Sequence, residues 1–418
     1  MTQIKKYLDR KDVGWLATLF GTAVGAGVLY LPVRAAKAGL IPLIVVTLLS
    51  IPAIWMAHRN LTWFCLSATD PKANITGTVV EKFGRKAGGI LTLSYFMSIY
   101  PILLLYGIGL TNVIHEMITT FSTYSPPARS VSSFIILSVL TFVIIKGEKW
   151  VSAACEMLVF PLVLILFFCA VYFIPIWQKP TLSSHSWLEF IKLSVLMAPL
   201  LVFSFNHSPS CSAFAQAYRL QYKDMSTCHM KTSRVLKFNI VLLLVTILPF
   251  VFSCVFSMTA QDVAYAVKYN IPALISISAA GYISWMPIVI SIITLLAITS
   301  SFFGVYIGSH EGATGLVDFI IKNTSETKSP QATKNLNIII HIFLFITNWI
   351  VASFNISVIT IIQALVAPVL AIILFIMPVI SMYLVKEMKV YRSPLADLYI
   401  FIFGLIVIFG FLISMIIK

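Results

Sequence analysis

Apolar runs of roughly 20 residues recur from one end of this chain to the other. A segment of that length can cross the roughly 30 Å hydrocarbon core of a bilayer as a helix. Lipid offers no partners for unpaired backbone groups, so helices are the expected form of the crossing segments. The runs therefore predict an all-α polytopic membrane protein.

We expect about 11 transmembrane helices in a single transmembrane domain that covers residues 1–418. Their predicted bounds are 13–34, 40–57, 89–118, 131–146, 152–176, 188–217, 235–257, 284–308, 336–354, 358–384 and 397–417. Residues 1–12 are polar and basic, and the apolar run that follows is too long for a secretory signal peptide. We therefore expect the N-terminus to be retained.

Charged residues make up only 11% of the chain, whereas a soluble domain typically carries about 25%. The formal net charge is +14, and most of the 29 lysines and arginines fall in segments that are cytoplasmic if the N-terminus is inside. This bias predicts an N-in, C-out topology. We interpret the positive charge as contact with anionic head groups of the lipid bilayer, and we expect no nucleic-acid partner.

The sequence contains no HExxH, GxSxG, Walker-type or CxxC motif, so we expect neither an enzyme nor an ATP-driven pump. Its six cysteines lie mostly inside apolar runs without paired spacing. This pattern favours free thiols over disulfides or a metal site. We expect no cofactor other than a coupling ion, H⁺ or Na⁺.

Two predicted spans are interrupted. The first holds Gly21, Gly25 and Gly27 within seven residues, and the sixth holds Pro209 among small polar residues. Gly/Pro interruptions at corresponding places in two halves are typical of transporters with inverted repeats. We therefore predict a 5+5 inverted repeat, with one repeat over 13–176, a second over 188–384, and an extra helix at 397–417.

The glycines of the first span permit a binding site, because each weakens a helix by about 1 kcal/mol relative to alanine. Unwinding would expose the amides of Gly25, Ala26 and Gly27 at a new helix N-terminus, which favours a carboxylate. The carbonyls of residues 21–23 would face an ammonium group or a cation. A close helix crossing is the alternative explanation, but the paired interruption in the sixth span favours binding.

Polar side chains at the second interruption point to the same function. Ser204, Asn206 and Ser208 are costly in lipid unless they face protein or water, so they could bond a substrate's amino group or hydroxyl. Phe203 and Phe205 either line the pocket or serve plain packing, and packing is at least as common.

Three residues are candidates for ion coupling. His207 could carry a proton, although a neutral, hydrogen-bonded core histidine is the more common case. Thr299 and Ser300 in the eighth span could complete an oxygen cage for a cation, or equally could bond their own helix backbone. Four further groups are expected at span ends and are not predicted to couple: Glu116, Glu156, His310 and Glu311.

Several motifs occur in order over nearly the whole chain. They are Leu19-Phe20-Gly21-Thr22-Ala23-Val24-Gly25-Ala26-Gly27-Val28-Leu29, Leu31-Pro32, Gly39-Leu40-Ile41-Pro42, Asn74-Ile75-Thr76, Phe203-Ser204-Phe205-Asn206, Ser208-Pro209, Ile271-Pro272, Ser301-Phe302-Phe303-Gly304, Gly308, Glu311-Gly312 and Ala367-Pro368. Together they resemble the hydroxy/aromatic amino acid permease family, and in particular its bacterial serine and threonine/serine transporters.

The resemblance implies the LeuT-like fold of the amino acid–polyamine–cation superfamily, with spans 1, 2, 6 and 7 moving as a bundle against the rest. It also implies a multi-pass protein of the bacterial cell inner membrane that takes up L-serine or L-threonine, usually with protons. The substrate-binding residues that it implies are Thr22, Ala23, Gly25, Ala26, Gly27, Ser204, Phe205 and Asn206.

We therefore predict an ion-coupled amino acid symporter that works by alternating access, with protons favoured and sodium left open. A tryptophan or tyrosine permease is the alternative within the family, although Phe203 and Phe205 favour a small substrate. A channel would need a continuous polar stripe along several helices. A non-transporting sensor would need a signalling domain or long tail, and the sequence carries neither feature.

Overall fold

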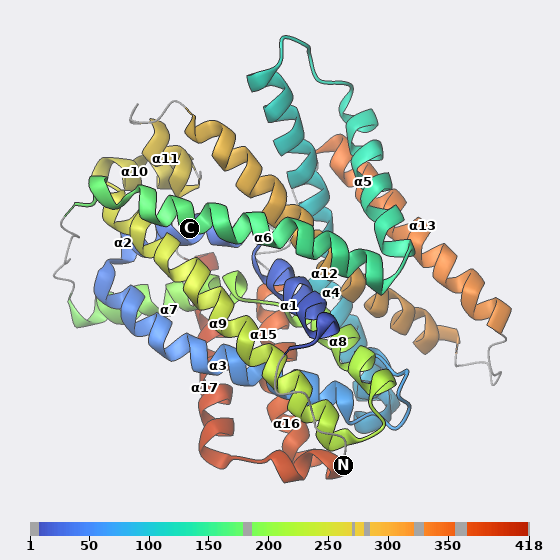
Figure 1. The fold of residues 1–418 in the computed structure, drawn as a ribbon. Coiled ribbons are helices and arrows are strands. Elements are labelled where there is room, and N and C mark those ends of the chain that lie inside the picture. The colour runs from blue at the N-terminus through green and yellow to red at the C-terminus, as the bar shows by residue number, and fades with distance from the viewer. Residues whose placement is uncertain are drawn as a thin grey trace.

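The computed structural model describes residues 8–178, 186–269, 272–279, 285–321, 330–355 and 366–416, and these parts form helices without a strand (Figure 1). Eight of the described helices are long and apolar enough to cross a membrane. They are α3 (Leu40–Leu66), α4 (Ile75–Phe121), α6 (Glu148–Tyr172), α7 (Trp187–Ser204), α9 (Met225–Ser257), α12 (Met286–Ile321), α13 (Pro330–Phe354) and α17 (Pro394–Ile416).

The other helices are shorter. They are α1 (Arg10–Ala23), α2 (Ala26–Ala38), α5 (Arg129–Ile145), α8 (Ser208–Gln221), α10 (Ala260–Tyr269), α11 (Ala273–Ala279), α15 (Ala367–Ala371) and α16 (Met377–Leu384), with short turns η1 (Ile174–Ile176), η3 (Ile372–Ile376) and η4 (Lys386–Tyr391). A ninth span forms if α1 and α2 are taken as one bent unit. The tenth predicted span, 358–384, lies partly outside the described residues.

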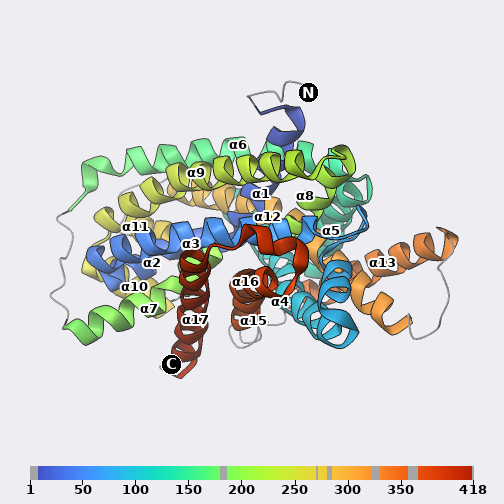
Figure 2. The ribbon, with the colours of Figure 1, turned by 90° about the horizontal axis from the view of Figure 1, so that it is seen from below.

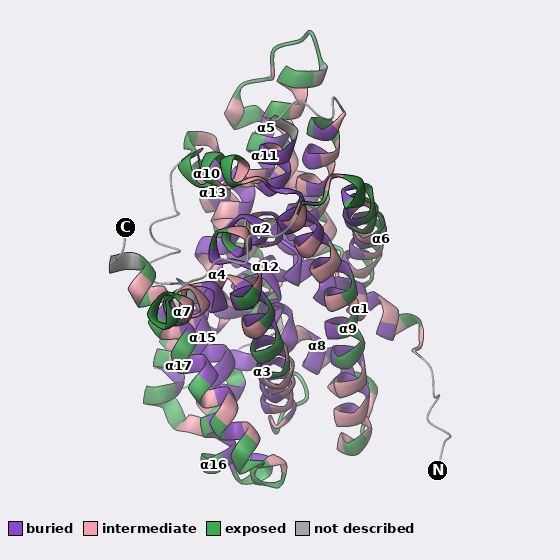
Figure 3. Ribbon diagram, turned by 90° about the vertical axis from the view of Figure 1, so that its left-hand side faces the viewer, coloured by how far each residue is buried: buried purple, intermediate pink, exposed green. Residues whose placement is uncertain are grey.

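The peripheral helices expose large apolar side chains, which agrees with the predicted polytopic membrane protein. On α6, Phe160, Leu164 and Phe168 are at least half exposed. Figure 3 shows exposed residues along the outer faces of α6 and α17, and buried residues toward α12 and α1. In water such a surface would be unfavourable, whereas in a bilayer it faces hydrocarbon.

The helices pack in two groups. In one group α2 packs on α7 and α1 packs on α8, and each of these four helices packs on α3 or α9. In the other group α4 packs with α12, α13 and α5 (Figures 1 and 2). The two groups meet where α12 contacts α1 and α8. The two interrupted spans therefore belong to one group, and α12 of the other group lies against both.

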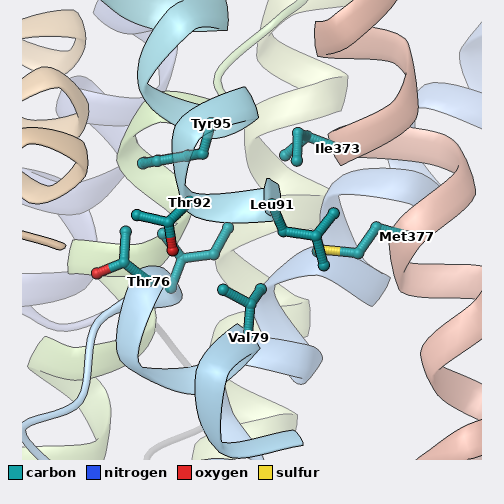
Figure 4. A pocket seen from close by; sticks show the side chains of 8 residues that line it. Thr76, Val79, Leu91, Thr92, Tyr95, Ile373 and Met377 are labelled. Atoms are coloured by element: carbon teal, nitrogen blue, oxygen red, sulfur yellow. The ribbon is translucent and has the colours of Figure 1, made fainter. Parts of the chain in front are cut away.

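Helix α4 reverses direction at Gly84, whose φ of +80° is a conformation that side chains disfavour. The two arms touch, because a Cβ at Gly88 would lie 2.5 Å from the Cα of Val80. Figure 4 shows a narrow pocket between these arms and the C-terminal helices, with Tyr95 at one end and Ile373 and Met377 opposite. Its lining is mostly apolar.

Buried ion pairs hold the start of α1. The Lys231 ammonium of α9 lies 2.8 Å from Asp9 Oδ2 and 2.7 Å from Asp12 Oδ2, and the Tyr218 hydroxyl of α8 donates to Asp12. Asp9 and Asp12 also form a capping box at the helix N-terminus. The N-terminal turn of α1 is thereby fixed to the neighbouring helices of its own group.

Several predicted spans were too short, and in two of them this changes the interpretation of polar residues. Helix α3 continues to Leu66 beyond the predicted end at 57, and α12 continues to Ile321 beyond 308. The expectation that Glu311 lies at a solvated helix end is therefore wrong, because only 9% of the residue is exposed. Packing of α12 against α4 and α8 buries this stretch in spite of its polar residues.

Candidate functional site

The first span breaks where the glycines predicted. Helix α1 ends at Ala23 and α2 begins at Ala26, with a bend of 52° between them. Gly25 is the N-cap of α2 and provides no side chain for the first amides of that helix. The Gly25 amide donates to Ala23 O at 3.0 Å. The first amides of a helix lack partners within it, so among the described residues those of Ala26 and Gly27 are the ones available to bind an anionic group.

The sixth span also breaks as predicted. Helix α7 ends at Ser204 and α8 begins at Ser208, which leaves Phe205, Asn206 and His207 outside regular helix. Asn206 precedes His207, the N-cap of α8, and its Oδ1 accepts a hydrogen bond from the amide of Ser208 at 3.1 Å. The Ser204 hydroxyl donates to Leu200 O of its own helix at 2.9 Å. Both polar side chains thus stabilise the local backbone of the break.

The two breaks lie against each other. A Cβ at Gly27 would be 2.9 Å from the Phe203 ring and 3.4 Å from the Ser204 hydroxyl. Thr22 Oγ1 lies 2.8 Å from Ser210 Oγ, which joins the end of α1 to the start of α8. The structure thus brings together the two segments that carry the predicted substrate-binding residues, which are Thr22, Ala23, Gly25, Ala26, Gly27, Ser204, Phe205 and Asn206.

Helix α12 supplies hydroxyl groups to the end of α1. Ser301 Oγ donates to Gly21 O at 2.7 Å and lies 3.3 Å from Thr22 O, and Ser300 Oγ lies 3.5 Å from Gly21 O. Of the predicted pair, Ser300 faces the break, whereas Thr299 is half-buried and Ser301 makes the shorter bond. These hydroxyls and carbonyls are hard oxygen ligands of the kind that suits a small cation.

Tyr106 of α4 was not predicted. A Cβ at Gly25 would lie 2.5 Å from its hydroxyl oxygen and 3.0 Å from Ser301 Oγ. The side chain is buried, with 4% of the residue exposed. Tyr106 therefore closes the first break from the side of α4, and only a glycine fits opposite its hydroxyl.

A second histidine accompanies His207. The imidazole of His58 on α3 stacks on that of His207, with ring centroids 3.7 Å apart. His207 Nδ1 faces Phe205 O at 3.1 Å, and a carbonyl can only accept, so this nitrogen carries the hydrogen. His207 Nε2 is buried without a hydrogen-bond partner among the described residues. That nitrogen is a free acceptor beside the break.

His58, which was not predicted, and Glu311, which was expected at a solvated helix end, were misjudged for one reason. His58 and Glu311 lie just beyond the predicted ends of the second and eighth spans, where polar residues interrupt the apolar pattern. The signal that could have found them is the rule that an ionisable residue inside a span indicates function. Applying it requires the full lengths of α3 and α12.

Comparison with known proteins gives consistent results. Residues 11–416 match the model of the tryptophan/tyrosine permease family. The chain is 38% identical over 413 residues to the serine transporter SdaC of Escherichia coli K12, covering 96% of this chain and 94% of the relative. It is 32% identical to the threonine/serine transporters TdcC of Yersinia enterocolitica, with 96% and 95% covered, and of Edwardsiella tarda, with 96% and 94% covered.

All three relatives are named as transporters, which agrees with the expectation that the chain is not an enzyme. The matched family accords with the resemblance drawn from the motifs, and it extends over almost the whole sequence. This chain therefore belongs to the tryptophan/tyrosine permease family.

Proposed function

We propose that this protein is a secondary active transporter that takes up L-serine or L-threonine with an ion, by alternating access. The observation that carries the proposal is the meeting of two broken spans at Gly27 and Ser204, with unpaired amides at the start of α2. The serine and threonine/serine transporters with which the chain shares 32% to 38% identity support this choice of substrate.

In this proposal the substrate lies between the breaks. Its carboxylate meets the amides near Gly25–Gly27, foremost those of Ala26 and Gly27, because the Gly25 amide donates to Ala23 O. Its ammonium group meets carbonyls of the two breaks. The substrate's own hydroxyl group meets Ser204, Asn206 or Thr22. Such an arrangement recognises the backbone of an amino acid and leaves its side chain to be selected by the surrounding wall.

The arrangement of two helix groups supports the proposal of alternating access. The group with α1, α2, α7 and α8 would rock against the group with α4 and α12, and the substrate would face each side of the membrane in turn. We propose the corresponding topology of eleven spans in a 5+5 inverted repeat plus one helix, N-in and C-out. The membrane would be the bacterial cell inner membrane.

Protons are the favoured coupling ion. Ser301 Oγ already donates to Gly21 O at 2.7 Å, so the carbonyl that would hold sodium is used by a hydroxyl. His207 Nε2, which lacks a partner among the described residues, is an available proton acceptor. Sodium coupling is the alternative, with Ser300 and Ser301 as ligands instead.

A tryptophan or tyrosine substrate is the second candidate, and the description of the family favours it. Phe203 argues against a bulky side chain, because its ring fills the space directly opposite Gly27. Direct competition distinguishes the two candidates. Unlabelled tryptophan in tenfold excess should leave uptake of labelled L-serine unchanged, whereas unlabelled L-threonine should reduce it.

The test of the proposed function is uptake of labelled L-serine into proteoliposomes under an imposed pH gradient or an imposed sodium gradient. Accumulation that depends on the pH gradient and disappears with a protonophore supports proton symport. Accumulation driven by sodium alone would instead assign the coupling site to Ser300 and Ser301. Failure of serine, threonine and tryptophan under both gradients would overturn the proposal.

A further inference from the structure

Glu311 is a carboxyl group buried within α12. The residue is 9% exposed, and within the described ranges no lysine, arginine or histidine nitrogen lies within 4.0 Å of its oxygens. Ionising a carboxyl in such surroundings is costly, because neither water nor a cation compensates the charge. The proposed function assigns no role to this group.

The partners of Glu311 suit a neutral carboxylic acid. The Tyr95 hydroxyl of α4 lies 3.5 Å from Oε2, and it lies equally far from Pro209 O at the start of α8. The Ser212 hydroxyl of α8 also faces the carboxyl and accepts a hydrogen bond from the amide of Ile75 at 2.8 Å. Because a hydroxyl can donate or accept, these partners tolerate both forms of the carboxyl.

Among the described residues, the titratable side chains that face Glu311 are weak acids. Tyr95 faces it from α4, Cys65 from α3 and Cys211 from α8, and all three are buried. The adjacent His310 stacks instead on His341 of α13, with ring centroids 4.4 Å apart. Protonation of the carboxyl is therefore the available way to keep this region neutral.

The carboxyl also lies at the boundary between the two helix groups. Helices α4 and α12 form one side of the boundary, and α3 and α8 form the other. Contact there is close, since a Cβ at Gly308 would lie 2.9 Å from Pro209 O and one at Gly304 would lie 2.6 Å from Ser210 Oγ. Separation of α8 from α12 would open this boundary to water and change the surroundings of Glu311.

We propose that Glu311 binds the transported proton. While α8 lies against α12, the carboxyl holds the proton. When the two helices separate, the O–H bond breaks, the electron pair stays on the carboxylate, and the proton passes to water. By linkage, protonation favours the closed boundary as strongly as closure favours protonation. This inference rests on the proposed proton-coupled transport, and it assigns the transported proton to Glu311 in place of His207 Nε2, the acceptor considered above.

The test compares wild type, Glu311→Gln, Glu311→Asp and the control Glu116→Gln in proteoliposomes. Glu116 is an exposed carboxylate near the end of α4. With one proton per serine, a gradient of one pH unit should drive about tenfold accumulation of labelled L-serine in wild type and control. Glu311→Gln, which cannot release a proton, should give no accumulation yet exchange internal for external serine within about twofold of wild type. Glu311→Asp should recover part of the accumulation.

Accumulation by Glu311→Gln equal to wild type would overturn this inference and leave the proposed transport function intact. Wild-type uptake driven by sodium alone would also overturn it, whereas an inactive wild type would instead reject the transporter assignment. If Glu311→Gln loses exchange, serine binding to the purified protein is measured across pH. Loss of the wild-type pH dependence supports the inference, and an unchanged pH dependence overturns it.

Discussion

The backbone amide of His207 donates a hydrogen bond to Nε2 of His58 at 3.1 Å. His58 Nδ1 faces Ile54 O at 2.8 Å, and a carbonyl can only accept, so the hydrogen of His58 is on Nδ1. Both bonds together fix His58 as the neutral tautomer. Through this bond to the His207 amide, the His58 side chain of helix α3 holds the second break. His58 thereby positions the segment that contains Asn206 and His207.

We predict that His58→Phe lowers both stability and uptake. Phenylalanine can keep the stacking on His207 but leaves the His207 amide buried without an acceptor, at a cost of about 1–3 kcal/mol. Thermal unfolding of the purified protein should shift to lower temperature, and uptake of labelled serine should fall. His115→Phe is the matched control, because His115 bonds Ser132 away from the breaks. Equal melting temperatures for His58→Phe and wild type would contradict the positioning role.

The sequence located both breaks because their cause is local. The glycines at 21, 25 and 27 each weaken a helix, and Pro209 suits the first turn of a new helix, where it stands in α8. Their clustering with small polar residues was visible without tertiary information. The ends of α3 and α12 were misplaced for the opposite reason. Whether His58 or Glu311 is buried depends on the helices that cover it, and polar residues within an apolar run look the same as a span end.

The face of α12 that points toward the first break could not be predicted from the sequence either. Successive residues of a helix differ by about 100° around its axis, so only some of three adjacent hydroxyls can face the first break. Ser300 and Ser301 face the break and bond Gly21 O, whereas Thr299 does not, because the glycines at 304 and 308 turn toward α8. That orientation is set by packing between helices that are nearly 100 residues apart in the chain.

We predict that Gly25→Ala abolishes uptake and that Tyr106→Phe in the same protein partly restores it. The added Cβ would lie 2.5 Å from the Tyr106 hydroxyl oxygen, which Tyr106→Phe removes. Uptake of labelled serine is measured at equal surface expression. Gly77→Ala is the control, since its Cβ would meet nothing closer than 3.6 Å. Normal uptake by Gly25→Ala would show that the first break does not need this close approach.

We predict that Lys231→Met strongly destabilises the protein. It leaves the carboxylate of Asp12, a residue that is 1% exposed, without its cation, and removing one partner of a buried pair typically costs about 3–5 kcal/mol. Adding Asp12→Asn should recover part of the loss, because the uncompensated charge is gone. Thermal unfolding in detergent measures both effects.

The control for this prediction is Lys11→Met. Lys11 lies 3.8 Å from Glu148 in a partly exposed pair, and such pairs contribute about 0–1 kcal/mol. Lys231→Met should therefore lower the melting temperature much more than Lys11→Met does. Similar melting temperatures for Lys11→Met and Lys231→Met would mean that the Lys231–Asp12 contact does not hold the start of α1.

Replacement of Ser301 separates the two coupling ions. Ser301→Ala removes a hydroxyl that donates to Gly21 O, a loss of about 1 kcal/mol that should slow uptake severalfold. With proton coupling, uptake by wild type and by Ser301→Ala should be independent of sodium concentration, because the hydroxyl acts only as a structural donor. With sodium coupling, the same hydroxyl would be a ligand, and Ser301→Ala would need far more sodium for half-maximal uptake.

Thr299→Ala is the control, because the bonds to Gly21 O come from Ser300 and Ser301. The measurement is serine uptake by wild type, Ser301→Ala and Thr299→Ala as a function of sodium concentration. If the sodium concentration for half-maximal uptake rises only in Ser301→Ala, proton coupling is contradicted.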